Sequence, residues 1–131
     1  MTARRCTAGW ALLALAAVGC VPAEPEPGAF AHLHYRNVST APGSVRLRPL
    51  EIEIEQGLAV RARVSAIDDN GEPLPLVDLR SSDPSVFVVE LGPMLGEYVF
   101  YGVQPGEVEM DIYSDMHFEA SVPVTVVDQP E

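Results

Sequence analysis

A two-residue hydrophobic period runs through the chain from Val45 onward and limits its fold more than any other feature. In residues 50–55 (LEIEIE), and again in residues 58–66, apolar side chains occupy every second position. In residues 107–112 (EVEMDI), apolar and acidic side chains alternate. Successive side chains of a strand point to opposite faces, whereas a helix repeats about every 3.6 residues. The pattern therefore predicts β-strands with one buried and one solvated face.

Turn signals separate these runs at intervals of about ten residues. Asn70-Gly71 accepts the positive φ of a tight reversal, Pro84 interrupts the chain, and residues 105–106 (PG) mark another turn. The pattern gives seven or eight short strands and no segment with a helical period. The sequence therefore predicts an all-β fold, a β-sandwich of antiparallel strands.

Four short segments follow one another within residues 45–128. They are residues 69–74 (DNGEPL), 81–86 (SSDPSV), 102–106 (GVQPG) and 124–126 (VTV). In order and spacing they resemble the bacterial immunoglobulin-like domains of the second group, which occur in intimins and invasins. The resemblance implies an immunoglobulin-like β-sandwich without a disulfide. Leu79 stands where the family usually has Trp, so we expect a smaller core centre.

The first twenty residues have the composition of an export signal. Arg4 and Arg5 precede the apolar run 10–18 (WALLALAAV), which is too short for a spanning helix because that needs about 20 apolar residues. Residues 17–20 (AVGC) resemble the lipobox of bacterial lipoproteins, whose cysteine is lipidated and begins the mature chain. We therefore expect residues 1–19 to be a lipoprotein signal peptide and Cys20 to carry a diacylglyceryl anchor. A simple secretory signal that ends in a chance cysteine is the alternative.

Residues 20–44 are expected to connect the lipid to the folded part. Residues 21–28 (VPAEPEPG) alternate prolines with glutamates. This favours an extended polyproline tether of about 25 Å, at about 3.1 Å per residue. Residues 29–38 are either an ordered arm or an additional strand. The predicted immunoglobulin-like domain spans residues 45–128, and residues 129–131 form a tail.

The residue after the cysteine bears on the membrane that holds the anchor. Retention in the inner membrane would place Asp there, and this chain has Val21. By the lipoprotein resemblance, we expect a lipid anchor in the outer membrane, with the protein on its periplasmic or surface face.

The core of the predicted sandwich follows from the alternation. Eleven apolar residues are expected inside, and a charge at Val108 or Met110 should unfold the domain. These residues are Leu58, Val60, Val64, Leu79, Val86, Val89, Val108, Met110, Ile112, Val124 and Val126.

The charge balance excludes most nucleic-acid roles. Eight arginines and no lysine stand against 19 acidic residues, which gives a formal net charge of −11. Binding to phosphates requires clustered basic residues, and here they are sparse and interleaved with carboxylates. Anionic lipid headgroups would repel the chain for the same reason.

Residues 68–72 carry the best candidate metal site. Asp68, Asp69, Asn70 and Glu72 place four oxygen-bearing side chains in one turn, as calcium requires. The downstream glutamate of an EF-hand is missing, and a plain hairpin turn is the alternative.

A second metal candidate involves the histidines. His32 and His34 are two positions apart, so a strand would place both rings on one face. They would need further ligands, such as His117, and a solvated arm is the simpler interpretation.

Aromatic residues give a candidate partner surface. If Val86 and Val89 face inward, Phe87 faces outward, and Tyr98 or Tyr101 lies on an exposed surface of the next strand. An exposed aromatic patch would mark a partner site. The alternative is that the two sheets bury these rings.

For nucleophilic catalysis, composition leaves open a Ser-His-Asp arrangement that uses His117, but the context of a nucleophile is missing. Cys6 lies in the predicted signal, Cys20 would be acylated, and no serine has the strand–turn–helix context of a nucleophile elbow. We therefore expect a protein that is not an enzyme. The first hypothesis is a lipid-anchored envelope protein whose single module serves for binding to, or assembly with, an envelope protein or a surface glycan, without a cofactor. The second is a calcium-dependent structural or adhesion module. The third is a small hydrolase or inhibitor, which no feature of the sequence supports.

Overall fold

The computed structural model describes residues 28–40 and 42–129. The predicted signal peptide, Cys20 and the tether up to Pro27 lie outside these residues. In the part of the chain that is described, no helix has the length and apolar character needed to cross a membrane.

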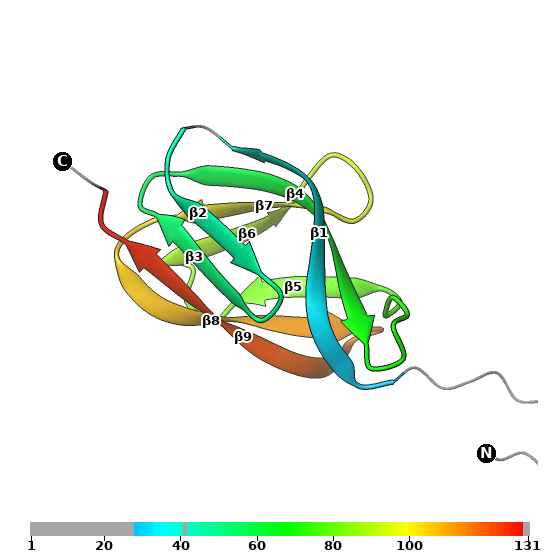
Figure 1. Ribbon diagram of the computed structural model, residues 1–131. Helices are drawn as coiled ribbons and strands as arrows, with labels where there is room; N and C mark the ends of the chain where they lie inside the picture. Colours follow the sequence, from blue (N-terminus) through cyan, green and yellow to red (C-terminus); the bar gives the residue numbers. More distant parts are fainter. Residues whose placement is uncertain (1–27, 41, 130–131) are drawn as a thin grey trace, which may run out of the picture.

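Nine strands form the described part of the chain and pack as two layers (Figure 1). One sheet has the order β1-β4-β7-β6, and the other has the order β2-β3-β9-β8-β5. The strands are β1 (Phe30–Thr40), β2 (Val45–Arg48), β3 (Glu51–Glu55), β4 (Ala59–Asp68), β5 (Val77–Ser81), β6 (Phe87–Leu91), β7 (Glu97–Gly102), β8 (Gly106–Ser114) and β9 (His117–Val127).

The prediction of an all-β, immunoglobulin-like sandwich is confirmed. Residues 28–40 and 42–129 hold nine strands instead of the seven or eight predicted, because residues 30–40 add one strand and residues 45–55 form two. One pair, β3 with β9, is parallel, with Ile52 opposite Val124 and Ile54 opposite Val126. A hairpin makes neighbouring strands antiparallel, but β3 and β9 are far apart in the chain. Their relative direction is therefore set by the path of the whole chain.

Strand β1 is the additional strand that the sequence left open. It pairs antiparallel with β4, and Leu33 is fully buried in the core. The Leu33 N–H donates to the Pro49 carbonyl at 2.9 Å, and the Tyr35 hydroxyl donates to the Arg48 carbonyl at 2.9 Å. Since Arg48 and Pro49 belong to the β2 side, β1 ties the edges of the two sheets together. The sandwich therefore includes residues before the predicted boundary at residue 45.

The core lies between the two sheets and contains every residue that the alternation placed there. Nine of the eleven are buried, and Val89 and Val108 are partly buried against them. The largest fully buried side chains are Phe87 and Phe100, whose rings stack at 5.9 Å between centroids. Leu79, at the position of the family tryptophan, is also buried.

The first and last strands begin and end at opposite ends of the sandwich. Strand β1 starts at the right-hand end in Figure 1, and β9 finishes at the left-hand end. The loops 69–76, 92–96 and 115–116 belong to the end where β1 starts, which we call the entry end. Residues 103–105 belong to the opposite end, where the Gln56 N–H donates to the Val127 carbonyl at 2.8 Å.

Candidate functional site

Asp68, the first member of the predicted calcium turn, is bound to the backbone around it. Its Oδ1 accepts hydrogen bonds from the N–H groups of Asn70 and Glu72, both at 2.9 Å, and its Oδ2 accepts one from Gly28 at 3.0 Å. The Glu72 N–H is the main cause that lowers the pKa of Asp68, and desolvation opposes it; the other backbone donors lower this pKa further. The carboxylate therefore stabilises the turn and joins Gly28, the first described residue, to it.

The other three residues of the predicted calcium turn are exposed. Asp69, Asn70 and Glu72 lie on the surface of the loop. Within residues 28–40 and 42–129, no three or more His, Cys, Asp and Glu side chains gather in a group that could hold a metal ion. Calcium binding stays a prediction, and titration with calcium while the melting temperature is followed tests it.

The structure separates the three histidines. His32 and His34 share the outer face of β1, because Leu33 between them points into the core. His117 begins β9 in the other sheet and is exposed. Ser114, which pairs with His117 across the hairpin, is buried and donates its hydroxyl to the Pro75 carbonyl at 2.6 Å. That hydroxyl is therefore used to hold the neighbouring loop.

Two of the three predicted partner-binding residues are in the core. Phe87 is fully buried, and Tyr98 is buried with its hydroxyl donating to the Val77 carbonyl at 2.8 Å. The expectation that Phe87 faces outward is wrong because Val86 lies in the turn before β6. The alternation starts at Phe87, so Phe87 and Val89 point inward. Burial raises the pKa of Tyr98, and the nearby Asp78 carboxylate adds to this effect.

Tyr101 is the predicted aromatic residue that reaches the surface, with 40% of its area exposed. It lies on the outer face of the β1-β4-β7-β6 sheet, between Ala59 of β4 and Val88 of β6. With Val99 and Val103 these residues line a shallow hollow of about 340 Å³, which we call the Tyr101 patch.

Charged side chains border the Tyr101 patch along the sheet. Val99 lies between Arg61 of β4 and Glu90 of β6 in the register. The Arg61 Nε lies 3.8 Å from a carboxylate oxygen of Glu97. An aromatic and aliphatic centre with a charged border is the usual arrangement of a protein-binding surface.

A second apolar surface was not expected from the sequence and lies at the entry end. Five of the nine exposed large hydrophobic residues in the described part of the chain lie here, and we call them the apolar pole. They are Leu76, Leu91, Met94, Leu95 and Met116. Because each occupies a loop or a strand end, no periodic pattern in the sequence brings them together.

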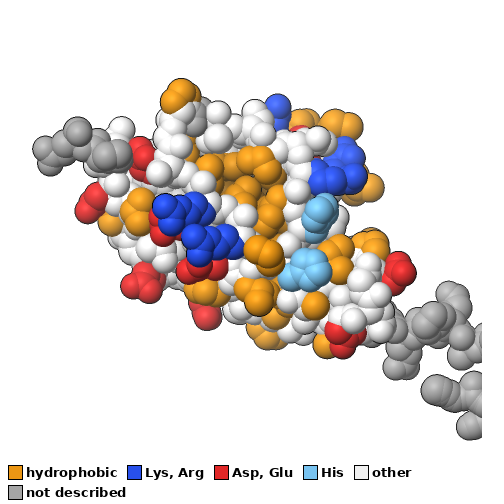
Figure 2. Space-filling model, viewed as in Figure 1, with side chains coloured by type: hydrophobic (Ala, Val, Ile, Leu, Met, Phe, Trp, Pro, Cys, Tyr) orange, Lys and Arg blue, Asp and Glu red, His pale blue; other side chains and the backbone are white. Residues whose placement is uncertain are grey.

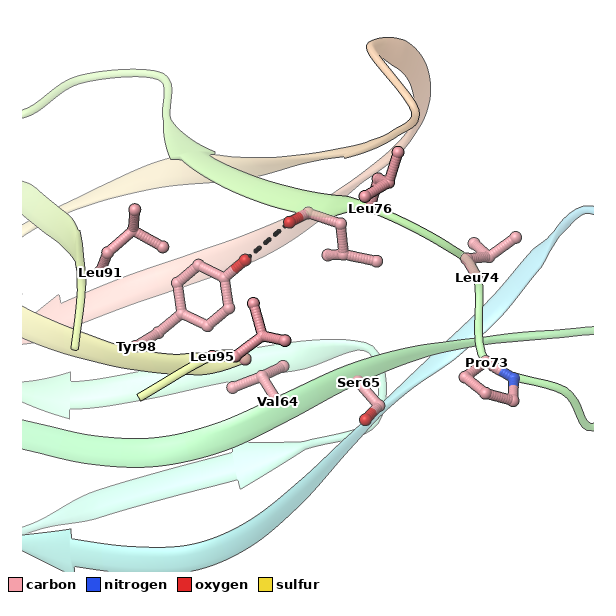
Figure 3. Close-up of a pocket in the computed structure, with 10 residues that line it drawn as sticks. Val64, Ser65, Pro73, Leu74, Leu76, Leu91, Leu95 and Tyr98 are labelled. Atoms are coloured by element: carbon pink, nitrogen blue, oxygen red, sulfur yellow. Dashed lines mark hydrogen bonds between the residues drawn. The ribbon is translucent and has the colours of Figure 1, made fainter. Parts of the chain in front are cut away.

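A groove of about 420 Å³ runs through the apolar pole. Figure 3 shows Tyr98 and Val64 beneath it, with Leu91 and Leu95 on one side and Leu74 and Leu76 on the other. Leu95 is 98% exposed and Leu76 is 75% exposed. The loops that carry the groove thus present their largest apolar side chains to solvent.

A third feature lies where the edges of the two sheets meet. Figure 2 shows a band of hydrophobic side chains across this face, with arginines and histidines beside it. Tyr35, Val45 and Leu47 of β1 and β2 pack partly buried against the core.

The fold defines the class of the protein as an immunoglobulin-like β-sandwich domain. No protein-family model and no curated protein matches the chain. Among solved structures it is similar to domains 4 and 5 of the S-layer protein SbsC, with 20% identity over 72% of this chain and 53% of that one, at a TM-score of 0.44. It is also similar to domains 5–6 of the same protein, with 22% identity over 70% and 45% of the two chains, at a TM-score of 0.47. The chain thus spans about half the length of these structures, and the likeness concerns the fold alone.

Proposed function

We propose that this protein is a non-catalytic envelope lipoprotein whose single immunoglobulin-like domain binds an envelope protein or a surface glycan through the Tyr101 patch. The lipid on Cys20 would hold it in the outer membrane, on the periplasmic or surface face. The proposal combines the lipobox-like residues 17–20 with the geometry of the sandwich. In chain order and spacing the turns also resemble the second group of bacterial immunoglobulin-like domains.

The observation that carries the proposal is the exposed position of Tyr101. The sheet buries every other aromatic ring of β6 and β7, namely Phe87, Tyr98 and Phe100. Tyr101 instead stands among aliphatic side chains on the outer face of that sheet. Tyrosine contributes a large rigid apolar area with a polar tip, and it is enriched at the centres of interfaces.

Site-specific crosslinking in cells tests this binding surface. A photo-reactive amino acid replaces Ala59, which is exposed and lies opposite Tyr101, in the full chain. The matched control carries the same group at Glu109, which is exposed on β8 of the other sheet. We expect a discrete adduct from position 59 and none from position 109.

The substitution Tyr101→Ala sharpens the same experiment. Because the side chain is exposed, its removal should leave the fold intact and abolish the adduct at position 59. An adduct that persists in Tyr101→Ala, or one that forms equally at both positions, would overturn the proposed surface.

The lipid anchor is tested separately, by mass spectrometry of the mature N-terminus and by release of a Cys20→Ser variant from the membrane.

A further inference from the structure

We propose that the apolar pole rests on the bilayer that holds the Cys20 lipid, with Leu76, Leu91, Leu95 and Met116 in contact with the interfacial region of that bilayer. This inference rests on the proposed lipid anchor. It adds an orientation: the entry end faces the membrane and the opposite end faces away from it.

The place where the described chain begins is the first support. Gly28 is fixed to Asp68 by a hydrogen bond, and the Asp69 N–H donates to the Ala29 carbonyl at 2.9 Å. The first described residues therefore lie against the loop that leads through residues 69–75 to Leu76. Eight residues, 20–27, separate Gly28 from the predicted lipid, a span of about 25 Å when extended. A lipid on Cys20 would therefore lie within about 25 Å of the entry end, nearer to it than to the opposite end of the sandwich.

The gathering of exposed apolar side chains at this end is the second support. Leu95 is 98% exposed and Met116 is 91% exposed, although both are large and apolar. The Asp115 N–H donates to the Leu76 carbonyl at 3.1 Å, so the 115–116 turn and the groove loops form one surface. Removal of such area from water is favourable, and a tether makes the contact intramolecular, which lowers its entropic cost.

The charge near the apolar pole determines which lipid headgroups it can contact. Asp115 adjoins Met116, Glu90 adjoins Leu91, and the whole chain carries a net charge of −11. Anionic headgroups would therefore repel this end, whereas zwitterionic headgroups would not. We commit to a zwitterionic bilayer as the occupant, in preference to a second copy of the chain or an apolar peptide.

The orientation agrees with the proposed binding surface. Tyr101 lies toward the end of β7 that leads into Gly102 and residues 103–105, which belong to the opposite end of the sandwich. With the pole on the lipid, the Tyr101 patch stands away from the membrane and is open to a partner.

A fluorescent reporter at Leu95 tests the contact. The mature chain would have one cysteine, Cys20, whose sulfur is blocked by the lipid, so a Leu95→Cys variant accepts a single environment-sensitive label. The control is Gln104→Cys, an exposed residue at the opposite end. Both acylated full-length proteins are purified and reconstituted in phosphatidylcholine vesicles, with and without nitroxide-labelled lipid.

We expect the label at position 95 to emit at shorter wavelength and to be quenched by nitroxide lipid, while the label at position 104 does neither. Replacement of part of the phosphatidylcholine by phosphatidylglycerol should weaken the effect. Equal, solvent-like signals at both positions in protein that floats with the vesicles would overturn the docking and leave the anchor standing. A label at 95 that is shielded from aqueous iodide but is not quenched by nitroxide lipid would also overturn it, since a protein would then cover the pole. Protein that does not float identifies failure of the anchor instead.

Discussion

The backbone N–H of Gly28 donates a 3.0 Å hydrogen bond to Oδ2 of Asp68, forty positions further along the chain. Through this bond, one carboxylate joins the first described residue to the turn that follows β4. The bond joins the point where β1 begins to the loop that leads to the apolar pole. The predictions below concern this contact, the two tyrosines with a raised pKa, the aromatic core and the β8–β9 turn.

The Asp68 carboxylate should make stability depend on acid pH. Its pKa in the folded domain is lowered, chiefly by the Glu72 N–H, while the unfolded value is about 3.9. A lowered pKa contributes stability that is complete above the unfolded value and is lost as the pH falls through the folded pKa. We expect Asp68→Asn to have a lower free energy of unfolding than wild type at neutral pH. This difference between the two proteins should become smaller below about pH 4. Urea unfolding at a series of pH values measures it, and a gap of constant size from neutral pH to about pH 2 would contradict the assignment.

Two tyrosines, the buried Tyr98 and the partly buried Tyr35, should make the stability of the domain fall in alkali. Burial raises the pKa of Tyr35 and of Tyr98 above the ordinary value. The unfolded chain therefore loses these protons first, and stability declines as the pH rises above about 10. Tyr35→Phe and Tyr98→Phe should each flatten this decline, and Tyr101→Phe at the surface serves as the control. A decline that is identical in all four proteins would refute the prediction.

The stacked pair Phe87 and Phe100 should dominate the core. We expect Phe100→Ala to lower the free energy of unfolding by about 3–5 kcal/mol, because it leaves a cavity beside Phe87. Tyr101→Ala, one position further along the chain, should change it by less than about 0.5 kcal/mol. Chemical denaturation compares the two, and the milder Phe100→Leu keeps the comparison possible if Phe100→Ala does not fold. Equal losses at positions 100 and 101 would show that the inward and outward faces of β7 are assigned wrongly.

The β8–β9 turn should be improved by glycine. Asp115 and Met116 have φ values of 50° and 68°, as a two-residue type I′ hairpin requires, and Met116 is almost fully exposed. Met116→Gly relieves the strain at that positive φ, and we expect it to raise stability by about 0.5–1 kcal/mol. Gly71→Ala is the opposite control. Gly71 has a φ of 83° and open space around it, so an added Cβ would meet no neighbouring atom. We expect this substitution to lower stability by a similar amount, because alanine disfavours that positive φ. Thermal unfolding measures both, and a loss of stability in Met116→Gly would count against the assigned turn.

Much of the fold could be predicted from the sequence because strand alternation is a local property. Residues 51–55 of the run LEIEIE form β3, and the alternating segment from residue 107 to 112 lies within β8. The candidate site was predicted less well. Tyr101 is on the surface, but Phe87 is in the core, because Val86 belongs to the turn and shifts the start of the alternation by one residue.

The sequence by itself determined that this chain forms short strands with one apolar face, since side chains of a strand alternate whatever lies beyond it. Only the tertiary structure decided which segments share a sheet, that β3 runs parallel to β9, and that β1 closes the sandwich edge. It also decided that Leu76, Leu95 and Met116 meet at one end, while Asp68 binds Gly28. Such relationships join residues far apart in the chain, so they exist only once the two sheets have packed and fixed the position of every loop.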